Sequence, residues 1–440
     1  MLDRLIGESS WKLLELLDRR DARFNLESLQ REIDKQRRIE AEGGCQETDV
    51  IAVRGLIFPT RPMNTAELFA WTGVADPSGA AWSETGIRLR HVQDWFLLAR
   101  GFSERADVFP DSPDSDKNRQ KRLQLAIMDE LDAPPGLPWG SRKGVDVWLP
   151  VSKNWDQSKV RVAVGALYTS ETCITKSLQK APDLSLKRWN RTAELMNSVL
   201  QGDETDYFVL HEVALPPTWF LTATLHLSRR HINLISGVEY LHGQSNTVHN
   251  QVWLSAVHNG FKFPSVALYT QDKQRPAHPE ADNLQDVGGL KLQPKNSWKG
   301  GAKPPKVAHG NFIFAMLVCS ELTNSAYRNS LRGAIDALFV VEWNKDLNTF
   351  NSLVEASALD IHCFVIQDNN RKYGDSRIRV PAKKSHERDM VQIRGGTNEH
   401  FVIGELKIKE LRDFQKLLSS DEETFKPLPD GFELAPNRRT

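Results

Sequence analysis

The amino-acid sequence predicts an α/β protein in which helices and sheets form layers. From about residue 158 onward, short apolar runs that are typical of buried strands alternate with amphipathic segments at helical spacing. Such alternation is characteristic of layered α/β architectures. With 440 residues, the chain is also long enough for two domains and a full hydrophobic core.

Each predicted element of this regular part rests on its apolar pattern. Residues 160–167 are mostly apolar, as in a strand that is buried on both faces. A later segment groups Leu195, Met196 and Val199 on one side of a helix. The predicted elements, in order, are a strand at 160–167, a helix at 189–200, a strand at 207–210, a helix at 217–230, a strand at 232–238, a strand that runs into Cys319, a helix that ends at Leu331, a strand at 337–341, a helix at 348–359 and a strand at 362–367.

The first 150 residues are predicted to form a mainly helical accessory region. Residues 1–45 carry leucines at helical spacing, and Asn25 is a suitable N-cap between two such stretches. Proline and glycine are dense at 109–117 and 133–141, which indicates loops or a linker. No motif in this region indicates a chemistry.

Charge balance, cysteine spacing and the lengths of apolar runs indicate which classes of protein this chain resembles. Lys plus Arg and Asp plus Glu both number 57, so net charge does not require a nucleic acid, a membrane or an acidic partner. The four cysteines are widely spaced and form no CxxC pair, as expected for reduced thiols in a cytoplasmic protein. Charges interrupt the N-terminal segment, and no apolar run approaches about 18 residues, so we expect neither secretion nor a membrane span.

The sequence also lacks the common signatures of metal and nucleotide sites. Six of the twelve histidines lie between His211 and His258, but no HExxH or comparable spacing is present. Neither a GxxxxGK[ST] phosphate loop nor a GxGxxG segment after a strand occurs. We therefore predict no metal and no cofactor.

Cys319 is the most informative single residue. Seven apolar residues precede it and polar residues follow at once, so the thiol is predicted to emerge where a buried strand ends. Open α/β sheets keep their chemistry at such strand ends. A cysteine in apolar surroundings is more often inert core, and Cys363 at 361–366 illustrates that alternative.

Several motifs together resemble the nitrilase-like carbon-nitrogen hydrolases over about residues 158–416. Residues 208–217 are similar to the family's strand with a catalytic glutamate, residues 269–280 to its lysine segment, and residues 317–321 to its nucleophile turn. Three further segments, at 332–341, 355–359 and 374–378, resemble its later strands and helix. The resemblance implies an α-β-β-α sandwich and at least a homodimer. It also divides the chain into an accessory region at 1–150, a catalytic domain at 158–416 and a C-terminal tail at 417–440.

The resemblance implies catalytic roles for Glu212, Lys273, Cys319 and Glu280. A thiol is mostly protonated at neutral pH, so a nucleophilic cysteine needs a nearby base or cation, and Glu212 would be that base. Burial and the like charge of Glu280 would raise the pKa of Glu212 toward working pH. Lys273 would stabilise the oxyanion that develops on the substrate.

The pocket around this set is predicted to include Ser320, Glu321 and Trp343, with the Ser320 N–H as a second oxyanion donor. The chain departs from the family where Ser320 replaces the usual aromatic residue after the nucleophile, and it lacks the usual histidine and leucine after Lys273. Both differences affect pocket walls. The sequence therefore predicts a small-molecule amide, nitrile or carbamoyl substrate without naming it.

Two other functions remain open at this point. An acyl transferase would use the same acyl-enzyme with an amine acceptor, and the Cys-x-Glu order at Cys319 and Glu321 resembles that branch slightly. A nitrilase-like interaction module in antiphage defence, associated with a nucleic-acid-processing partner, is the other alternative. Two basic segments would suit such a partner. The first has five lysines between 291 and 306 with no acidic residue among them, and we interpret it as a mobile loop. The second is the basic stretch at 371–394. The five lysines are Lys291, Lys295, Lys299, Lys303 and Lys306.

Overall fold

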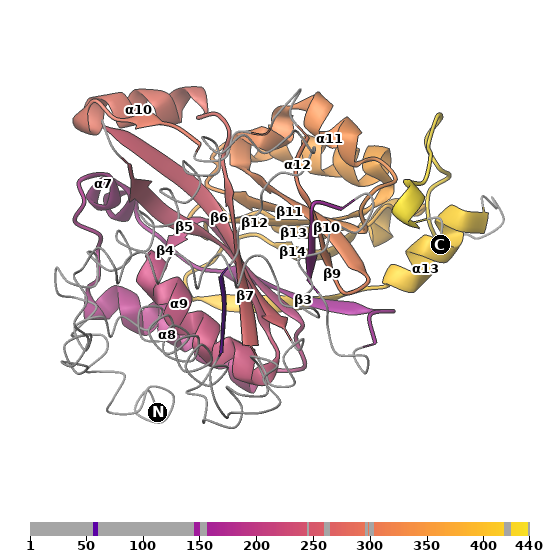
Figure 1. Cartoon of the computed structure of the whole chain (residues 1–440), viewed down its shortest axis with the longest axis horizontal. Helices are drawn as coiled ribbons and strands as arrows, with labels where there is room; N and C mark the ends of the chain where they lie inside the picture. The colour runs from indigo at the N-terminus through magenta and orange to yellow at the C-terminus, as the bar shows by residue number, and fades with distance from the viewer. Residues whose placement is uncertain are drawn as a thin grey trace, which may run out of the picture.

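Two sheets that pack face to face form the centre of the protein, and helices cover the outer face of each (Figure 1). The computed structural model describes residues 56–59, 145–149, 156–243, 246–258, 265–294, 298, 303–417 and 424–438. Helices α8 and α9 pack on the first sheet, and α11 and α12 lie on the side of the second. The predicted α-β-β-α sandwich is confirmed.

The first sheet runs in the order β1-β7-β6-β5-β4-β3-β15, with β8 beside β6. Strands β3, β4 and β5 are parallel, so their carboxyl ends meet at one edge. The strands of this sheet are β1 (Leu56–Pro59), β3 (Val160–Ala166), β4 (Tyr207–Leu215), β5 (Asn233–His242), β6 (Thr247–His258), β7 (Ser265–Asp272), β8 (Lys291–Leu292) and β15 (His400–Leu406).

The second sheet runs in the order β14-β13-β12-β11-β10-β9-β2, and its central strands β10, β11 and β12 are parallel. Strands β11 and β12 lie against β4 of the first sheet. The carboxyl ends of the parallel strands therefore come together from both sheets. The strands are β2 (Val147–Leu149), β9 (Lys306–His309), β10 (Phe312–Val318), β11 (Ala337–Glu342), β12 (Phe364–Asn369), β13 (Ser376–Arg379) and β14 (Asp389–Ile393).

The helices agree with most predicted positions. Pro217 begins α9 at a position where its missing N–H costs nothing, and a short 3₁₀ turn at Ser228–Arg230 completes the predicted segment. The predicted strand at 207–210 continues to Leu215. The helices are α7 (Glu171–Leu178), α8 (Leu186–Gln201), α9 (Pro217–Leu227), α10 (His278–Gly288), α11 (Ser325–Leu331), α12 (Leu347–Ser357) and α13 (Ile408–Leu417).

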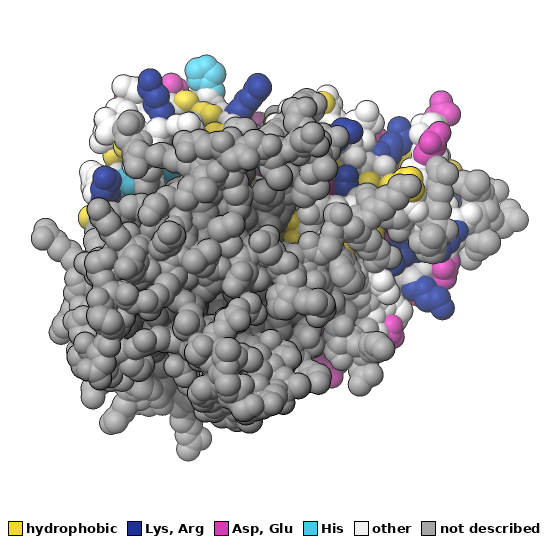
Figure 2. Space-filling model, viewed as in Figure 1, with side chains coloured by type: hydrophobic (Ala, Val, Ile, Leu, Met, Phe, Trp, Pro, Cys, Tyr) yellow, Lys and Arg dark blue, Asp and Glu magenta, His cyan; other side chains and the backbone are white. Residues whose placement is uncertain are grey.

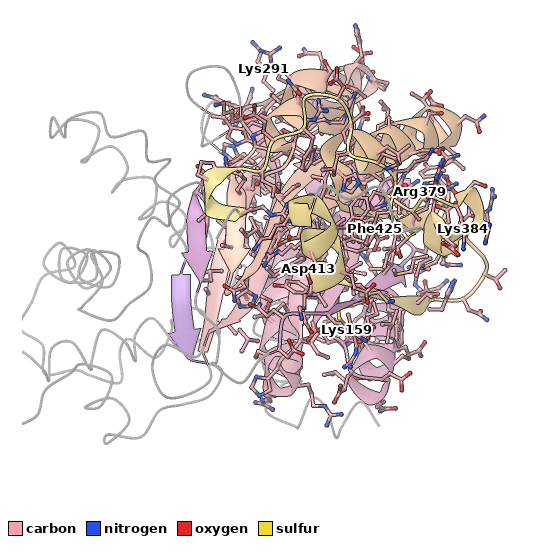
Figure 3. All side chains as sticks on the ribbon, turned by 90° about the vertical axis from the view of Figure 1, so that its right-hand side faces the viewer. Lys159, Lys291, Arg379, Lys384, Asp413 and Phe425 are labelled. Carbon is pink, nitrogen blue, oxygen red and sulfur yellow. The ribbon has the colours of Figure 1, made fainter. Side chains whose placement is uncertain are left out.

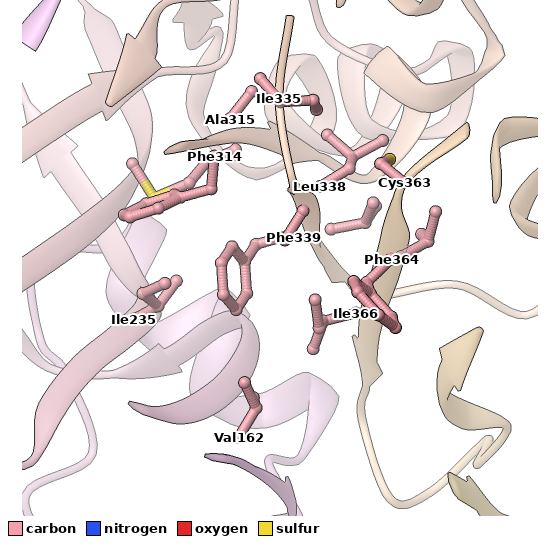
Figure 4. Close-up of a cluster of buried hydrophobic side chains, with 14 of the residues drawn as sticks. Val162, Ile235, Phe314, Ala315, Ile335, Leu338, Phe339, Cys363, Phe364 and Ile366 are labelled. Carbon is pink, nitrogen blue, oxygen red and sulfur yellow. The ribbon is translucent and has the colours of Figure 1, made fainter. Parts of the chain in front are cut away.

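The main hydrophobic core lies between the two sheets. Figure 4 shows Phe339 of β11 pointing toward Ile235 and Val162 of the opposite sheet. Leu338, the preceding residue, lies near Cys363, as the alternation of side chains along a strand requires. Cys363 is fully buried, and this burial raises the pKa of its thiol, so its interpretation as an inert core residue fits its surroundings.

The interpretation of residues 291–306 as a loop is wrong at both ends. Lys291 lies in β8 and pairs with Thr247, and Lys306 lies in β9 and pairs with Ala315. Lys291 is exposed on the two-residue strand β8, and Lys306 is half-buried in β9 between β10 and β2, so the polar composition did not require a loop. Lys295 and Lys299 lie outside the described residues.

The second basic stretch is largely neutralised by neighbouring acids. Arg377 contacts Asp375 at 2.6 Å and Asp389 at 3.2 Å, and Arg379 contacts Glu355 at 2.9 Å. Figure 3 places Lys384 of this stretch and Lys291 at different edges of the molecule. Figure 2 shows both signs of charge mixed along the coloured edge near α10 and α13. The two basic stretches therefore do not combine into one surface.

The C-terminal residues 424–438 pack against the sandwich. Arg438 donates to the buried Asp336 at 2.7 Å, and Phe425 bridges to Ala382. Most of residues 1–150 lie outside the described residues, including the predicted helices there. The described pieces of that region contribute β1 and β2, one strand to each sheet. Among the helices that the structure describes, none is long and apolar enough to cross a membrane.

His309 joins the two sheets through a neutral imidazole. Its Nδ1 lies 2.6 Å from the hydroxyl of Tyr207, and its Nε2 lies 2.9 Å from the carbonyl of Val257. The carbonyl of Val257 can only accept, so Nε2 donates to it, and the Tyr207 hydroxyl can donate to Nδ1 of the neutral ring. Burial lowers the pKa of His309 to about 4.

We expect His309 to make folding sensitive to acid. A folded-state pKa of about 4, below the ordinary value of 6.5, means that its stabilising effect is complete above pH 6.5 and is lost as pH falls toward 4. The loss should be about 3 kcal/mol of unfolding free energy, which urea titrations at several pH values would measure. His309→Gln should reduce this dependence, although His211, whose pKa burial also lowers to about 4, still contributes to it. His278→Gln, at an exposed site on α10, should leave it unchanged. An unchanged slope in His309→Gln would contradict the assignment.

Candidate active site

Glu212 occupies an irregular part of β4. The register between β4 and β5 shifts between Leu210 and Leu215, and Val213 adopts a positive φ of 55°. Such bulges redirect a side chain out of the regular ladder. Gly237 on β5 makes room for this backbone, because a Cβ there would lie 2.5 Å from the Glu212 Cα. The carboxylate is thereby held in the interior, where Glu212 is only 3 % exposed.

Lys273 follows β7 and places its ammonium between two carboxylates. Its backbone N–H donates to the carbonyl of Asn250 at 2.8 Å, which fixes the start of the segment. Its Nζ lies 2.9 Å from Glu212 Oε1 and 2.6 Å from Glu280 Oε2. Lys273 is 1 % exposed, so these two contacts compensate the loss of water around the charge.

Two residues that the sequence did not single out complete this arrangement. Asn250 of β6 donates through Nδ2 to Glu212 at 2.8 Å and to Glu280 at 2.9 Å. Tyr240 of β5 donates its hydroxyl to Glu280 at 2.7 Å. The sequence offers one weak signal for Asn250, since it lies in a run of three polar residues directly before the apolar residues 252–254.

Cys319 lies at the turn that follows β10. It is the first residue of a 3₁₀ segment at Cys319–Thr323 and has a φ of +48°. A non-glycine residue at positive φ is strained, and such strain is concentrated at functional sites, including the turns that expose nucleophiles. The predicted emergence of the thiol at the end of the strand matches this geometry.

The peptide of Trp343 connects the thiol with Glu212. Its N–H donates to Glu212 Oε2 at 3.0 Å, and its carbonyl lies 4.0 Å from the Cys319 Sγ. Trp343 follows β11, the strand next to β10, so parallel pairing brings it beside the turn. The structure thus brings Glu212, Lys273, Glu280 and Cys319 into one connected cluster.

Burial and charge together set the protonation of this cluster. Burial raises the pKa of Cys319 well above its usual value, the charge of Glu212 adds to this, and Lys273 opposes it. For Lys273, burial lowers the pKa, but the charges of Glu212 and Glu280 outweigh it and raise the pKa. For Glu280, burial raises the pKa, but Lys273 holds it below the ordinary value. The resting cluster therefore contains a neutral thiol and a charged ammonium.

The predicted pocket residues have different positions. Glu321 is buried, and both of its oxygens accept hydrogen bonds from backbone N–H groups. Ser320 lies in the same turn, and its carbonyl accepts from the hydroxyl of Thr323. The indole of Trp343 contacts the rings of His211 and Tyr373.

Glu342 is a further acidic residue close to the cluster. It ends β11, is fully buried and accepts a hydrogen bond from Gln367 at 2.9 Å. Burial raises its pKa well above the ordinary value, and the charge of Glu212 acts in the same direction. The raised pKa favours the neutral form of Glu342, and its charged form would raise the pKa of Cys319. Among the described residues, no three His, Cys, Asp or Glu side chains are grouped as metal ligands would be.

Comparison with known proteins gives structural neighbours only. No protein-family model and no curated protein matches the chain. Each of the similar solved structures named below is of a carbon-nitrogen hydrolase or nitrilase superfamily protein.

Three of these structures illustrate the likeness. A CN-hydrolase superfamily protein from Xanthomonas campestris, with an arsenic adduct in its active site, is 15 % identical, with a TM-score of 0.41 over 58 % of this chain and 94 % of that one. Nit3 from Saccharomyces cerevisiae is 15 % identical, with a TM-score of 0.42 over 60 % and 96 %. An amidase from Nesterenkonia sp. is 13 % identical, with a TM-score of 0.39 over 58 % and 92 %.

We expect Gly237→Ala to displace the bulge that carries Glu212. The added methyl group would meet the Val213 nitrogen at 2.6 Å as well as the Glu212 Cα, and neither backbone atom can rotate away. Overpacking of this kind should lower the free energy of unfolding by about 1–3 kcal/mol in urea titrations. Gly288→Ala, where the added methyl group would meet its nearest neighbour at 3.6 Å, is the matched control for stability. If Gly237→Ala proved as stable as the parent protein, the close approach would not constrain the bulge.

Proposed function

We propose that the protein is a thiol-dependent hydrolase of a non-peptide carbon-nitrogen bond, acting on a small amide or carbamoyl compound. The observation that carries the proposal is the shared environment of Lys273 and Cys319. Lys273 is held by Glu212 and Glu280, and the Trp343 peptide contacts both Glu212 and the thiol. A base, a cation and a nucleophile in one buried cluster are the groups that acyl transfer through a cysteine requires.

The arrangement supports a definite order of steps. Because the resting thiol is neutral, Glu212 accepts its proton while Sγ attacks the carbonyl carbon. The amine then leaves with that proton, and a thioester remains on Cys319. Water attacks the thioester, Glu212 accepts a proton from the water and returns one to the thiol, and the acid is released.

Lys273 has one donor left for the developing oxyanion. An ammonium group carries three N–H donors. Two of them contact Glu212 and Glu280, and the third has no acceptor among the described residues. That third N–H is suited to the substrate oxygen, where charge develops in the transition state. This assignment gives Lys273 a role beyond neutralising the two carboxylates.

The test is intact-mass analysis of the full chain with a panel of small amides. A covalent acyl adduct should form on Cys319 and disappear in Cys319→Ala. Cys363→Ala, which removes a buried thiol away from the cluster, should keep the adduct. Lys273→Met should slow acylation by about a hundredfold or more, as for loss of an oxyanion donor.

The same experiment distinguishes a hydrolase from an acyl transferase and from an interaction module. An added amine acceptor that diverts the product from acid to amide would favour an acyl transferase with the same acyl-enzyme. No adduct across amides and carbamoyl compounds would overturn the enzymatic proposal and leave an interaction module. Sedimentation analysis would test the expected homodimer.

A further inference from the structure

Glu321 is a buried carboxylate that is held by two backbone N–H groups. It lies two residues after Cys319 in the 3₁₀ segment and is only 4 % exposed. One oxygen accepts the N–H of Gln274 at 2.8 Å, and the other accepts the N–H of Val318 at 2.9 Å. A charged group that has lost its water needs such donors. Here both donors belong to the backbone.

These two donors flank the two groups on which the proposed chemistry depends. Gln274 directly follows Lys273, and Val318 directly precedes Cys319. Strand β7, which precedes Lys273, belongs to one sheet and β10 to the other, so no strand ladder sets their spacing. The carboxylate of Glu321 therefore connects two backbone segments that the sheets do not pair.

We infer that Glu321 is a positioning residue that sets the Lys273 ammonium relative to the Cys319 thiol. The inference rests on the proposed function for its catalytic meaning, but the connection itself does not. This role differs from the predicted contact with substrate, because each oxygen of Glu321 accepts a peptide N–H group. Glu321 would therefore affect the reaction rate only by holding Lys273 and Cys319 in position.

The environment of Glu321 makes this connection sensitive to protonation. Burial raises the pKa of Glu321 to about 7, and the negative charge of Glu212 acts in the same direction. The two backbone N–H groups and the charge of Lys273 lower the pKa and only partly offset the effect of burial. The charge of Glu321 also acts on Tyr327 of α11. A protonated oxygen presents an O–H toward an N–H donor and loosens that contact. Positioning should therefore weaken as pH falls below about 7.

The test uses the full chain and two readouts on three variants. Glu321→Gln places an NH₂ group against one backbone N–H, Glu321→Asp keeps the charge on a shorter side chain, and Thr323→Ala is the control in the same turn. In Glu321→Gln, the acylation rate should fall by about tenfold to a hundredfold with little change in KM, as expected for misplacement rather than lost binding. Glu321→Asp should restore part of that loss, and Thr323→Ala should match the parent protein.

The second readout needs no substrate, so it separates this inference from the proposed function. Iodoacetamide alkylation of Cys319, followed by peptide mapping across pH, reports how Lys273 acts on the thiol. The profile of Glu321→Gln should move to higher pH and lose any step near pH 7. If the parent protein forms no acyl adduct but the profile still moves, the proposed function fails and the positioning role holds.

A Glu321→Gln profile that coincides with that of Thr323→Ala would overturn the positioning role. Circular dichroism and thermal unfolding must first show that Glu321→Gln is folded. If it is not, Glu321→Asp carries the test, and an unchanged alkylation profile in that variant would overturn the inference equally.

Discussion

The buried ammonium of Lys273 is the interaction on which the arrangement of the site depends. An unpaired charge in the interior would cost several kcal/mol, so the fold must supply compensating groups on more than one side. Glu212 and Glu280 supply the charge, and Asn250 and Tyr240 supply the donors that fix those carboxylates. The bulge in β4 places Glu212 beside this ammonium, and Gly237 leaves room for the bulge.

The thiol reaches this cluster from the other sheet. Its position depends on the close packing of the two sheets, in which Phe339 of one fills space against Ile235 of the other. Two polar connections then refine the approach: the peptide of Trp343 and the carboxylate of Glu321. Apolar packing sets the coarse distance between the halves of the site, and these directional hydrogen bonds set its details.

The sequence predicted those features that a local pattern determines. The apolar run before Cys319 predicted both a buried strand and a thiol at its end, because burial on two faces leaves a continuous apolar signature. Asn250, Tyr240 and Gly237 were missed, because their roles arise only when strands far apart in sequence pair. The lysines at 291 and 306 misled, because lysines on short strands give a segment the polar composition of a loop.

Strand β2 has a consequence for where this protein can be cut. Its three residues pair in parallel with β9 at the edge of the second sheet, although they precede the catalytic domain as the sequence delimits it. A chain that began at residue 158 would leave the outer side of β9 without this neighbour. Unpaired N–H and C=O groups along a strand recruit other strands, so such a fragment would expose an adhesive edge. The folded unit therefore extends upstream of residue 158.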